Sequence, residues 1–240
     1  MPPNLWKAPA GMVSFVSLVM TAGVGAFSLV AVANQSSGRT FDLLTASVAD
    51  IQAAVDSGKL TYERLVELYL SRIEAYDRNG PKLNAVVALN PKAREVAREL
   101  DRERASRGRR SLLHGIPIAV KDTVDVRDIT SAGGNLALKG TFPKYDATVV
   151  KKLRDAGAII FFKANLDEFN LGAQGISTFG PTGNPYDPKR NPGGSSSGPG
   201  VAVNVGFATL GIATETGASI RSPASNNSLV GVGGTGGGVS

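Results

Sequence analysis

Two short apolar runs separated by an amphipathic helix constrain the fold of this chain more than any other feature of its sequence. The runs cover residues 116–120 and 158–162, and helical periodicity covers residues 149–156 between them. An apolar run of this length is typical of a buried strand, and the order strand, helix, strand predicts an α/β fold. We therefore expect a sheet that contains both runs.

The sequence before residue 110 predicts a mainly helical scaffold. Helix-capping residues, apolar periodicity and turn residues alternate along this part of the chain. The expected elements are a helix opened by the capping pair Ser47 and Asp50 and stopped by Gly58, a helix capped by Thr61 that ends at residues 79–81, a strand at 83–89 and a charged helix at 92–110.

The charged helix carries much of the basic character of the chain, whose net charge is +6. Its arginines are interleaved with acidic residues, and Ala93, Ala97 and Leu100 belong to an apolar stripe on the opposite face. No aromatic residue lies between the arginines, as a site for single-stranded nucleic acid would favour. We expect a solvated helix face and no nucleic-acid partner.

Residue types exclude several kinds of site. The chain has no cysteine, so disulfides, thiolate catalysis and cysteine metal sites are ruled out. His114 is the only histidine, and its position just before the first apolar run favours a structural role over a catalytic one. The glycine-rich residues 193–200 lack the Gly-Lys-Ser/Thr sequence of a phosphate-binding loop. We expect no metal and no cofactor.

The N-terminus predicts a targeting segment. Lys7 precedes an uncharged, mainly apolar stretch over residues 8–33 that ends in Ala31-Val32-Ala33. This pattern predicts a secretory signal peptide at 1–33 and a secreted protein, and the alternative is an uncleaved membrane anchor. Cleavage would leave no stable membrane contact. Asn34 and Asn226 begin Asn-x-Ser sequons, which carry glycan in some secreted proteins.

A serine nucleophile with a lysine base is the chemistry that these exclusions leave open. Residues 165–200 are rich in Gly, Pro, Asn and Ser, which predicts long loops on the α/β scaffold, where functional residues are often found. A serine hydroxyl needs a base, and a lysine can serve if burial lowers its pKa. Lys121 follows the first apolar run directly, so it is a candidate for such a buried base.

Six motifs in the second half of the chain resemble those of the amidase-signature family, in the family's order. They are GIPIAVKD at 115–122, YDATVV at 145–150, KANLDEF at 163–169, FGPT with NP at 179–185, GGSSSG at 193–198 and TETGASIR at 214–221. The resemblance implies a three-layer α/β/α fold with a central mixed sheet. It also implies that residues 34–240 are only the N-terminal part of that domain, with a sheet edge and core surface exposed.

The resemblance implies a role for each matching residue. Ser219 matches the nucleophile, Lys121 the base and Ser195 the serine that relays the proton between them, 24 positions before Ser219. In the family a cis peptide bond precedes the relay serine, here Gly194-Ser195. Ser196 matches a residue that hydrogen-bonds the lysine.

The implied reaction is hydrolysis of a carbon–nitrogen bond in a small-molecule amide through an acyl-enzyme. Its oxyanion would be bound by backbone N–H groups of four consecutive residues. These residues are Thr216, Gly217, Ala218 and Ser219. The resemblance makes Asp167 and Glu168 structural, and Arg221 is expected to support the loop rather than bind substrate.

Departures from the family pattern leave other interpretations open. Ala218 stands where the family has glycine, so its methyl group is expected to obstruct the oxyanion site. Pro199 and the valines that follow it are expected to weaken the helix after the glycine-serine motif. The alternatives are a catalytically inactive amidase remnant and a glutamyl-tRNA(Gln) amidotransferase A-type subunit. Oligomeric state is not predicted.

Overall fold

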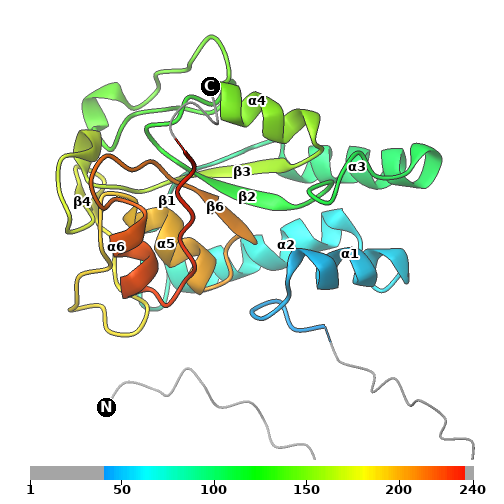
Figure 1. The fold of residues 1–240 in the computed structure, drawn as a ribbon, viewed down its shortest axis with the longest axis horizontal. Helices are drawn as coiled ribbons and strands as arrows, with labels where there is room; N and C mark the ends of the chain where they lie inside the picture. The colour runs from blue at the N-terminus through cyan, green and yellow to red at the C-terminus, as the bar shows by residue number, and fades with distance from the viewer. Residues whose placement is uncertain (1–40, 236–240) are drawn as a thin grey trace, which may run out of the picture. The chain divides into compact units, whose positions relative to one another are not determined.

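The structure is a computed structural model, and it describes residues 41–235 (Figure 1). The predicted signal peptide at 1–33 and the sequon at Asn34 lie outside the described residues. No helix within residues 41–235 is both long and apolar enough to cross a bilayer.

A four-stranded mixed sheet forms the centre of the fold, in the order β1-β3-β2-β6. Its strands are β1 (Val86–Leu89), β2 (Pro117–Lys121), β3 (Ile159–Ala164) and β6 (Leu210–Ile212). β3 pairs antiparallel with β1 and parallel with β2, and β2 also pairs parallel with β6. The mixed α/β sheet that the sequence predicts is therefore confirmed, and both apolar runs form its inner strands.

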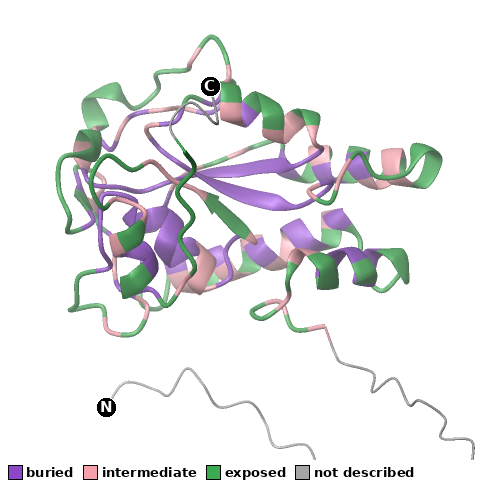
Figure 2. Cartoon of the chain, in the orientation of Figure 1, coloured by how far each residue is buried: buried purple, intermediate pink, exposed green. Residues whose placement is uncertain are grey.

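Helices cover both sides of this sheet. Figure 1 shows α4 (Thr148–Asp155) on one side and α5 (Ser197–Asn204) on the other. α3 (Ala93–Arg107) and α4 pack against β3, and α5 packs against β2, β3 and β6. Every residue of β2 and β3 is buried as a result, whereas β6 at the sheet edge is largely exposed (Figure 2).

The N-terminal helices begin at the capping residues that the sequence predicts. α1 (Val48–Asp56) opens with a full capping box, in which the Ser47 N–H donates to Asp50 and the Asp50 N–H donates to Ser47. α2 (Tyr62–Arg72) begins after Thr61, whose hydroxyl accepts the N–H of Arg64 at 3.0 Å. α2 then continues as a π-helix, η1 (Ile73–Arg78).

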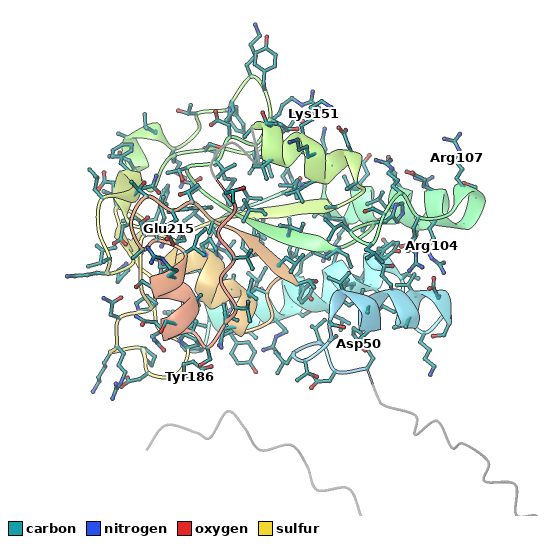
Figure 3. All side chains as sticks on the ribbon, viewed as in Figure 1. Asp50, Arg104, Arg107, Lys151, Tyr186 and Glu215 are labelled. Atoms are coloured by element: carbon teal, nitrogen blue, oxygen red, sulfur yellow. The ribbon has the colours of Figure 1, made fainter. Side chains whose placement is uncertain are left out.

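α3 confirms the interpretation of the charged segment as a solvated helix face. Ala93, Ala97 and Leu100 are buried in the core. Two of its arginines pair with carboxylates of the neighbouring helices, Arg98 with Glu63 at 2.7 Å and Arg104 with Asp56 at 2.7 Å. Figure 3 shows Arg104 on the side of α3 that faces α1 and Arg107 extending from the other side of the helix. Arg98 and Arg104 are thus used in ion pairs with the neighbouring helices.

The loops beyond β3 contain only short elements. They are η3 (Glu168–Asn170) and an antiparallel pair of two-residue strands, β4 (Ile176–Ser177) and β5 (Gly180–Pro181), while η2 (Leu136–Leu138) lies in the loop after β2. α6 (Arg221–Asn226) follows β6.

α5 forms in spite of Pro199. The proline is the third residue of the helix, within the first turn, where backbone N–H groups have no partner inside the helix. Its missing N–H therefore removes no helical hydrogen bond. The expected weakening is not visible as a break, since α5 runs from Ser197 to Asn204 and its first six residues are buried.

Candidate active site

Lys121 is carried into the interior by the strand that it ends. It is the last residue of β2, it lies opposite Ala164 on β3, and its side chain is fully buried. The apolar run before it pairs with a strand on each side, so the backbone holds the lysine at the end of parallel strands, where loops commonly form binding sites.

A chain of hydrogen bonds links Lys121 to the two candidate serines. Lys121 Nζ donates to Ser195 Oγ at 2.7 Å, and Ser195 Oγ donates to Ser219 Oγ at 2.9 Å. Ser195 is fully buried, whereas Ser219 is partly exposed. The Gly194-Ser195 peptide bond is cis, as expected. The fold therefore brings together three side chains that are far apart in the sequence, and solvent reaches only the last of them.

Thr214 provides the second hydroxyl at Lys121, so the prediction for Ser196 is wrong. Lys121 Nζ donates to Thr214 Oγ1 at 3.0 Å. Ser196 Oγ instead donates to the backbone carbonyl of Thr214 at 3.2 Å. Ser196 is the last residue before α5, and its hydrogen bond therefore ties the start of that helix to the backbone of Thr214.

Burial changes the acid–base behaviour of Lys121. Removal from water disfavours the charged ammonium and lowers the pKa of Lys121 to about 8, although the negative charge of Asp167 acts in the opposite direction. A larger fraction of this amine is therefore neutral near physiological pH than for an exposed lysine. A neutral amine has a lone pair and can accept a proton.

The loop that precedes α6 presents free backbone donors. Within residues 41–235, no acceptor is found for the N–H groups of the four predicted oxyanion-site residues, 216–219. Ala218 is exposed and is not among the non-glycine residues with positive φ. Its backbone conformation therefore does not require glycine, and the predicted obstruction has no support in the local backbone.

Glu215 and Arg221 close this loop, and sequence reasoning missed Glu215. Glu215 accepts the backbone N–H groups of Ile220 at 2.7 Å and Arg221 at 3.0 Å, and its other oxygen accepts Arg221 Nε at 2.7 Å. Arg221 also donates to the carbonyl of Gly217. These bonds lower the pKa of the Glu215 carboxyl. Figure 3 shows Glu215 beside the start of α6. The contacts confirm that Arg221 supports the loop.

A buried ion pair, also missed from the sequence, lies next to the lysine strand. Lys163 on β3 and Asp122 directly after β2 are both fully buried and 3.6 Å apart. Lys163 also donates to the carbonyl of Val124 at 2.6 Å, and Asp122 accepts the N–H of Gly134 at 3.0 Å. Burial lowers the pKa of Lys163 to about 8 and raises that of Asp122. The pair fixes the loop that follows Lys121.

His114 has the structural role that its position suggests. It is fully buried, its Nε2 lies 3.0 Å from the carbonyl of Leu100, and its Nδ1 accepts the N–H of Arg110 at 3.3 Å. Residues 41–235 contain no cluster of three or more His, Cys, Asp or Glu side chains that could hold a metal ion.

An apolar cavity of about 860 Å³ lies beside the serine–lysine chain but does not include it. Its lining comes from α5, β6, α6, residues 213–215 and residues 229–235, together with Val124 and Val149. Ser196 and Thr214 contribute to the lining, whereas Lys121, Ser195 and Ser219 do not. The cavity therefore adjoins the site at Ser196 and Thr214 and not at the three linked side chains.

Comparison with known proteins gives matches over most of the chain. The Amidase family model matches residues 64–240. The A-type subunit of the glutamyl-tRNA(Gln) amidotransferase of Streptomyces coelicolor is 41% identical over 201 residues, which cover 83% of this chain and 40% of that protein.

Solved structures give the same picture. The peptide amidase of Stenotrophomonas maltophilia matches with 45% identity and a TM-score of 0.72, over 75% of this chain and 38% of its own. An amidase family protein of Bacillus anthracis matches with 41% identity and a TM-score of 0.73, over 76% and 37% respectively. The chain thus spans about two fifths of the length of these relatives.

Proposed function

Because this chain belongs to the amidase family, we propose that it hydrolyses carbon–nitrogen amide bonds, with Ser219 as nucleophile, Ser195 as proton relay and Lys121 as base. The observation that carries the proposal is the hydrogen-bonded sequence from Lys121 Nζ through Ser195 Oγ to Ser219 Oγ. A lysine held close to a serine in a dry site can take the place of the histidine used by other serine hydrolases.

The first step is attack by Ser219 Oγ on the carbonyl carbon of the amide. Ser219 gives its proton to Ser195, and Ser195 gives its own proton to the lone pair of Lys121. Lys121 Nζ donates to both Ser195 and Thr214 in the structure, as an ammonium does. When the amine is neutral, it keeps the N–H that donates to Thr214 and directs its lone pair at Ser195, and the hydroxyls of Ser219 and Ser195 rotate so that each donates towards the lysine. The products of this step are a tetrahedral oxyanion and a protonated lysine.

Backbone N–H groups of residues 216–219 would bind the oxyanion. Their lack of partners within residues 41–235 supports this role. Each such donor is typically worth about 3 kcal/mol in the transition state. Collapse of the intermediate breaks the carbon–nitrogen bond, and the proton on Lys121 returns through Ser195 to the leaving amine.

Water completes the cycle by attack on the ester of Ser219. Lys121 and Ser195 take a proton from this water and return one to Ser219 Oγ. The acid is released and the serine is free again. One amide and one water thus give one acid and one amine, with no cofactor required.

Labelling with a serine-directed fluorophosphonate tests the proposal without knowledge of the substrate. We expect the purified chain to be labelled, and we expect the label to be lost in both Ser219→Ala and Lys121→Ala. A folded chain that takes no label would contradict the proposal and favour an inactive remnant.

The substrate class we propose is a small amide of the kind that a peptide amidase accepts, since the Stenotrophomonas peptide amidase is 45% identical over the matched part. The second candidate is an amidotransferase A-type subunit, which the 41% identity to the Streptomyces coelicolor protein favours. Release of ammonia from a panel of peptide amides and free glutamine distinguishes them. Preference for peptide amides supports the first candidate, and activity on glutamine alone supports the second.

A further inference from the structure

Asp167 is a buried carboxylate to which the reaction sequence above gives no role. It follows β3 and is 2% exposed. Its Oδ1 accepts the backbone N–H groups of Gln174 at 3.3 Å and Ile176 at 2.9 Å. Its Oδ2 is buried and has no hydrogen-bond partner among the described residues. A buried carboxylate oxygen without a partner is costly, so its position calls for an explanation.

The unpaired oxygen lies against the peptide that carries the relay serine. The backbone N–H of Asp167 donates to the carbonyl of Ser195 at 3.0 Å. A Cβ atom placed on Gly194 would lie 1.9 Å from Asp167 Oδ2, so only glycine leaves room for the carboxylate. Asp167 thus contacts both residues of the Gly194–Ser195 peptide, one through its side chain and one through its backbone.

Asp167 is also the acidic group whose charge acts on Lys121. Two other carboxylates near the site are paired with cations, Asp122 with Lys163 at 3.6 Å and Glu215 with Arg221 at 2.7 Å. The opposite charges within each pair largely cancel, so each pair has little electrostatic effect on Lys121. Glu168, the next residue, accepts a hydrogen bond from Asn135 and is not among the groups that act on Lys121. The carboxylate of Asp167 has no cationic partner in the described part of the chain.

We propose that Asp167 is a positioning residue of this site, an inference that rests on the proposed function. It holds the Gly194–Ser195 peptide through its two contacts, and its unpaired oxygen supplies the negative charge that stabilises Lys121 when the amine takes the proton from Ser195. The proton stays on Lys121 until it passes to the leaving amine, so Asp167 itself exchanges no proton.

The pH dependence of fluorophosphonate labelling tests this role. Asp167→Asn removes the charge and keeps the size of the side chain, and Glu168→Gln makes the same charge change at the next residue. We expect the midpoint of the rate against pH to fall by about one pH unit in Asp167→Asn, because loss of a nearby opposite charge favours the neutral amine. The Glu168→Gln midpoint should stay at the unsubstituted value.

A second charge-free variant and a direct titration keep the test decisive. Asp167→Ser should show the same downward shift, even if Asp167→Asn folds poorly. NMR titration of ¹³Cε-labelled lysine in a Ser219→Ala background reports the protonation of Lys121 whether or not the serine reacts. It therefore separates failure of this inference from failure of the proposed function. Unchanged midpoints in both variants, with only a lower rate, would overturn the proposal and leave Asp167 as a packing residue.

Discussion

Thr214 is the residue whose contribution sequence reasoning did not anticipate. Its hydroxyl accepts a hydrogen bond from Lys121 Nζ at 3.0 Å. This bond limits the orientations in which the amine can face Ser195. We expect Thr214→Val to lower the fluorophosphonate labelling rate about tenfold, since a lost hydrogen bond to a charged or reacting group costs on the order of 1.5 kcal/mol. Thr214→Ser keeps the hydroxyl and should react almost as the unsubstituted chain does. Equal rates for both variants would contradict this role.

In the proposed mechanism, the pKa of the buried Lys121 amine sets the pH at which Ser219 becomes reactive. Only neutral Lys121 can accept a proton, and burial lowers its pKa to about 8. We therefore expect the labelling rate to rise with pH, with a midpoint near 8, and to level off above it. A midpoint at the ordinary lysine pKa of about 10.4 would show that Lys121 is solvated in the free protein. Lys121→Arg, which keeps its charge over this range, should remain unreactive throughout.

The resemblance to the amidase-signature motifs predicts the three side chains of the proposed triad but not their hydrogen-bond partners. Lys121, Ser195 and Ser219 are predicted from the motifs and do form one connected chain. The contact expected of Ser196 is made by Thr214, because the direction of a hydroxyl depends on how α5 and the segment after β6 pack together. That packing is a property of the fold and leaves no signal in the local sequence.

At the scale of one element, the loop before α6 is held by the contacts between Glu215 and Arg221. The carboxylate binds two consecutive backbone N–H groups and a guanidinium, so it fixes the chain on the C-terminal side of Ser219. We expect Glu215→Ala to lower the labelling rate on the order of a hundredfold, since small displacements of a reacting group have effects of that size. Glu215→Gln keeps an acceptor and should lose less.

A surface carboxylate elsewhere provides the matched control for this prediction. Glu67 pairs with Arg64 at 2.9 Å on the outside of α2, far along the chain from the serines. Glu67→Ala should leave the labelling rate unchanged. If Glu215→Ala reacts as fast as Glu67→Ala does, the contacts between Glu215 and Arg221 do not position Ser219.

Elements governed by local contacts were the most predictable. The capping residues Ser47 and Thr61 mark the helix starts because each side chain binds an N–H three residues ahead. The π-helical end of α2 was not predicted, and it coincides with the buried Asp77, whose carboxylate accepts the N–H of Ala85 at 2.6 Å. Helical periodicity carries no sign of a contact between residues that far apart.

Over residues 41–235 as a whole, the sequence predicts a mixed sheet but not the order of its strands. Apolar runs identify β2 and β3 because both are buried on two faces. β6 is only three residues long and is mostly exposed, so it gives no comparable signal. Its place beside β2 is nevertheless what brings the segment with Thr214 and Ser219 next to Lys121.

The exposed edge of β6 leads to a prediction about the association of the chain. Within residues 41–235, β6 pairs on one side only, with β2. Leu210 on this strand is 37% exposed, and Val230 and Val232, which help to line the adjoining cavity, are 92% and 79% exposed. An unpaired strand edge beside exposed apolar side chains favours pairing with another strand. We therefore expect reversible self-association that increases with protein concentration.

Sedimentation velocity of two leucine variants tests whether β6 is responsible. Leu210→Lys places a charge on the strand edge and should shift the population towards monomer. Leu112→Lys makes the same change at a residue that is 71% exposed in the turn before β2, and it should sediment as the unsubstituted chain does. Equal effects of both variants would assign the association to general surface hydrophobicity. No effect of Leu210→Lys would contradict a role of β6 in association, because a lysine on a strand edge disfavours pairing with another strand.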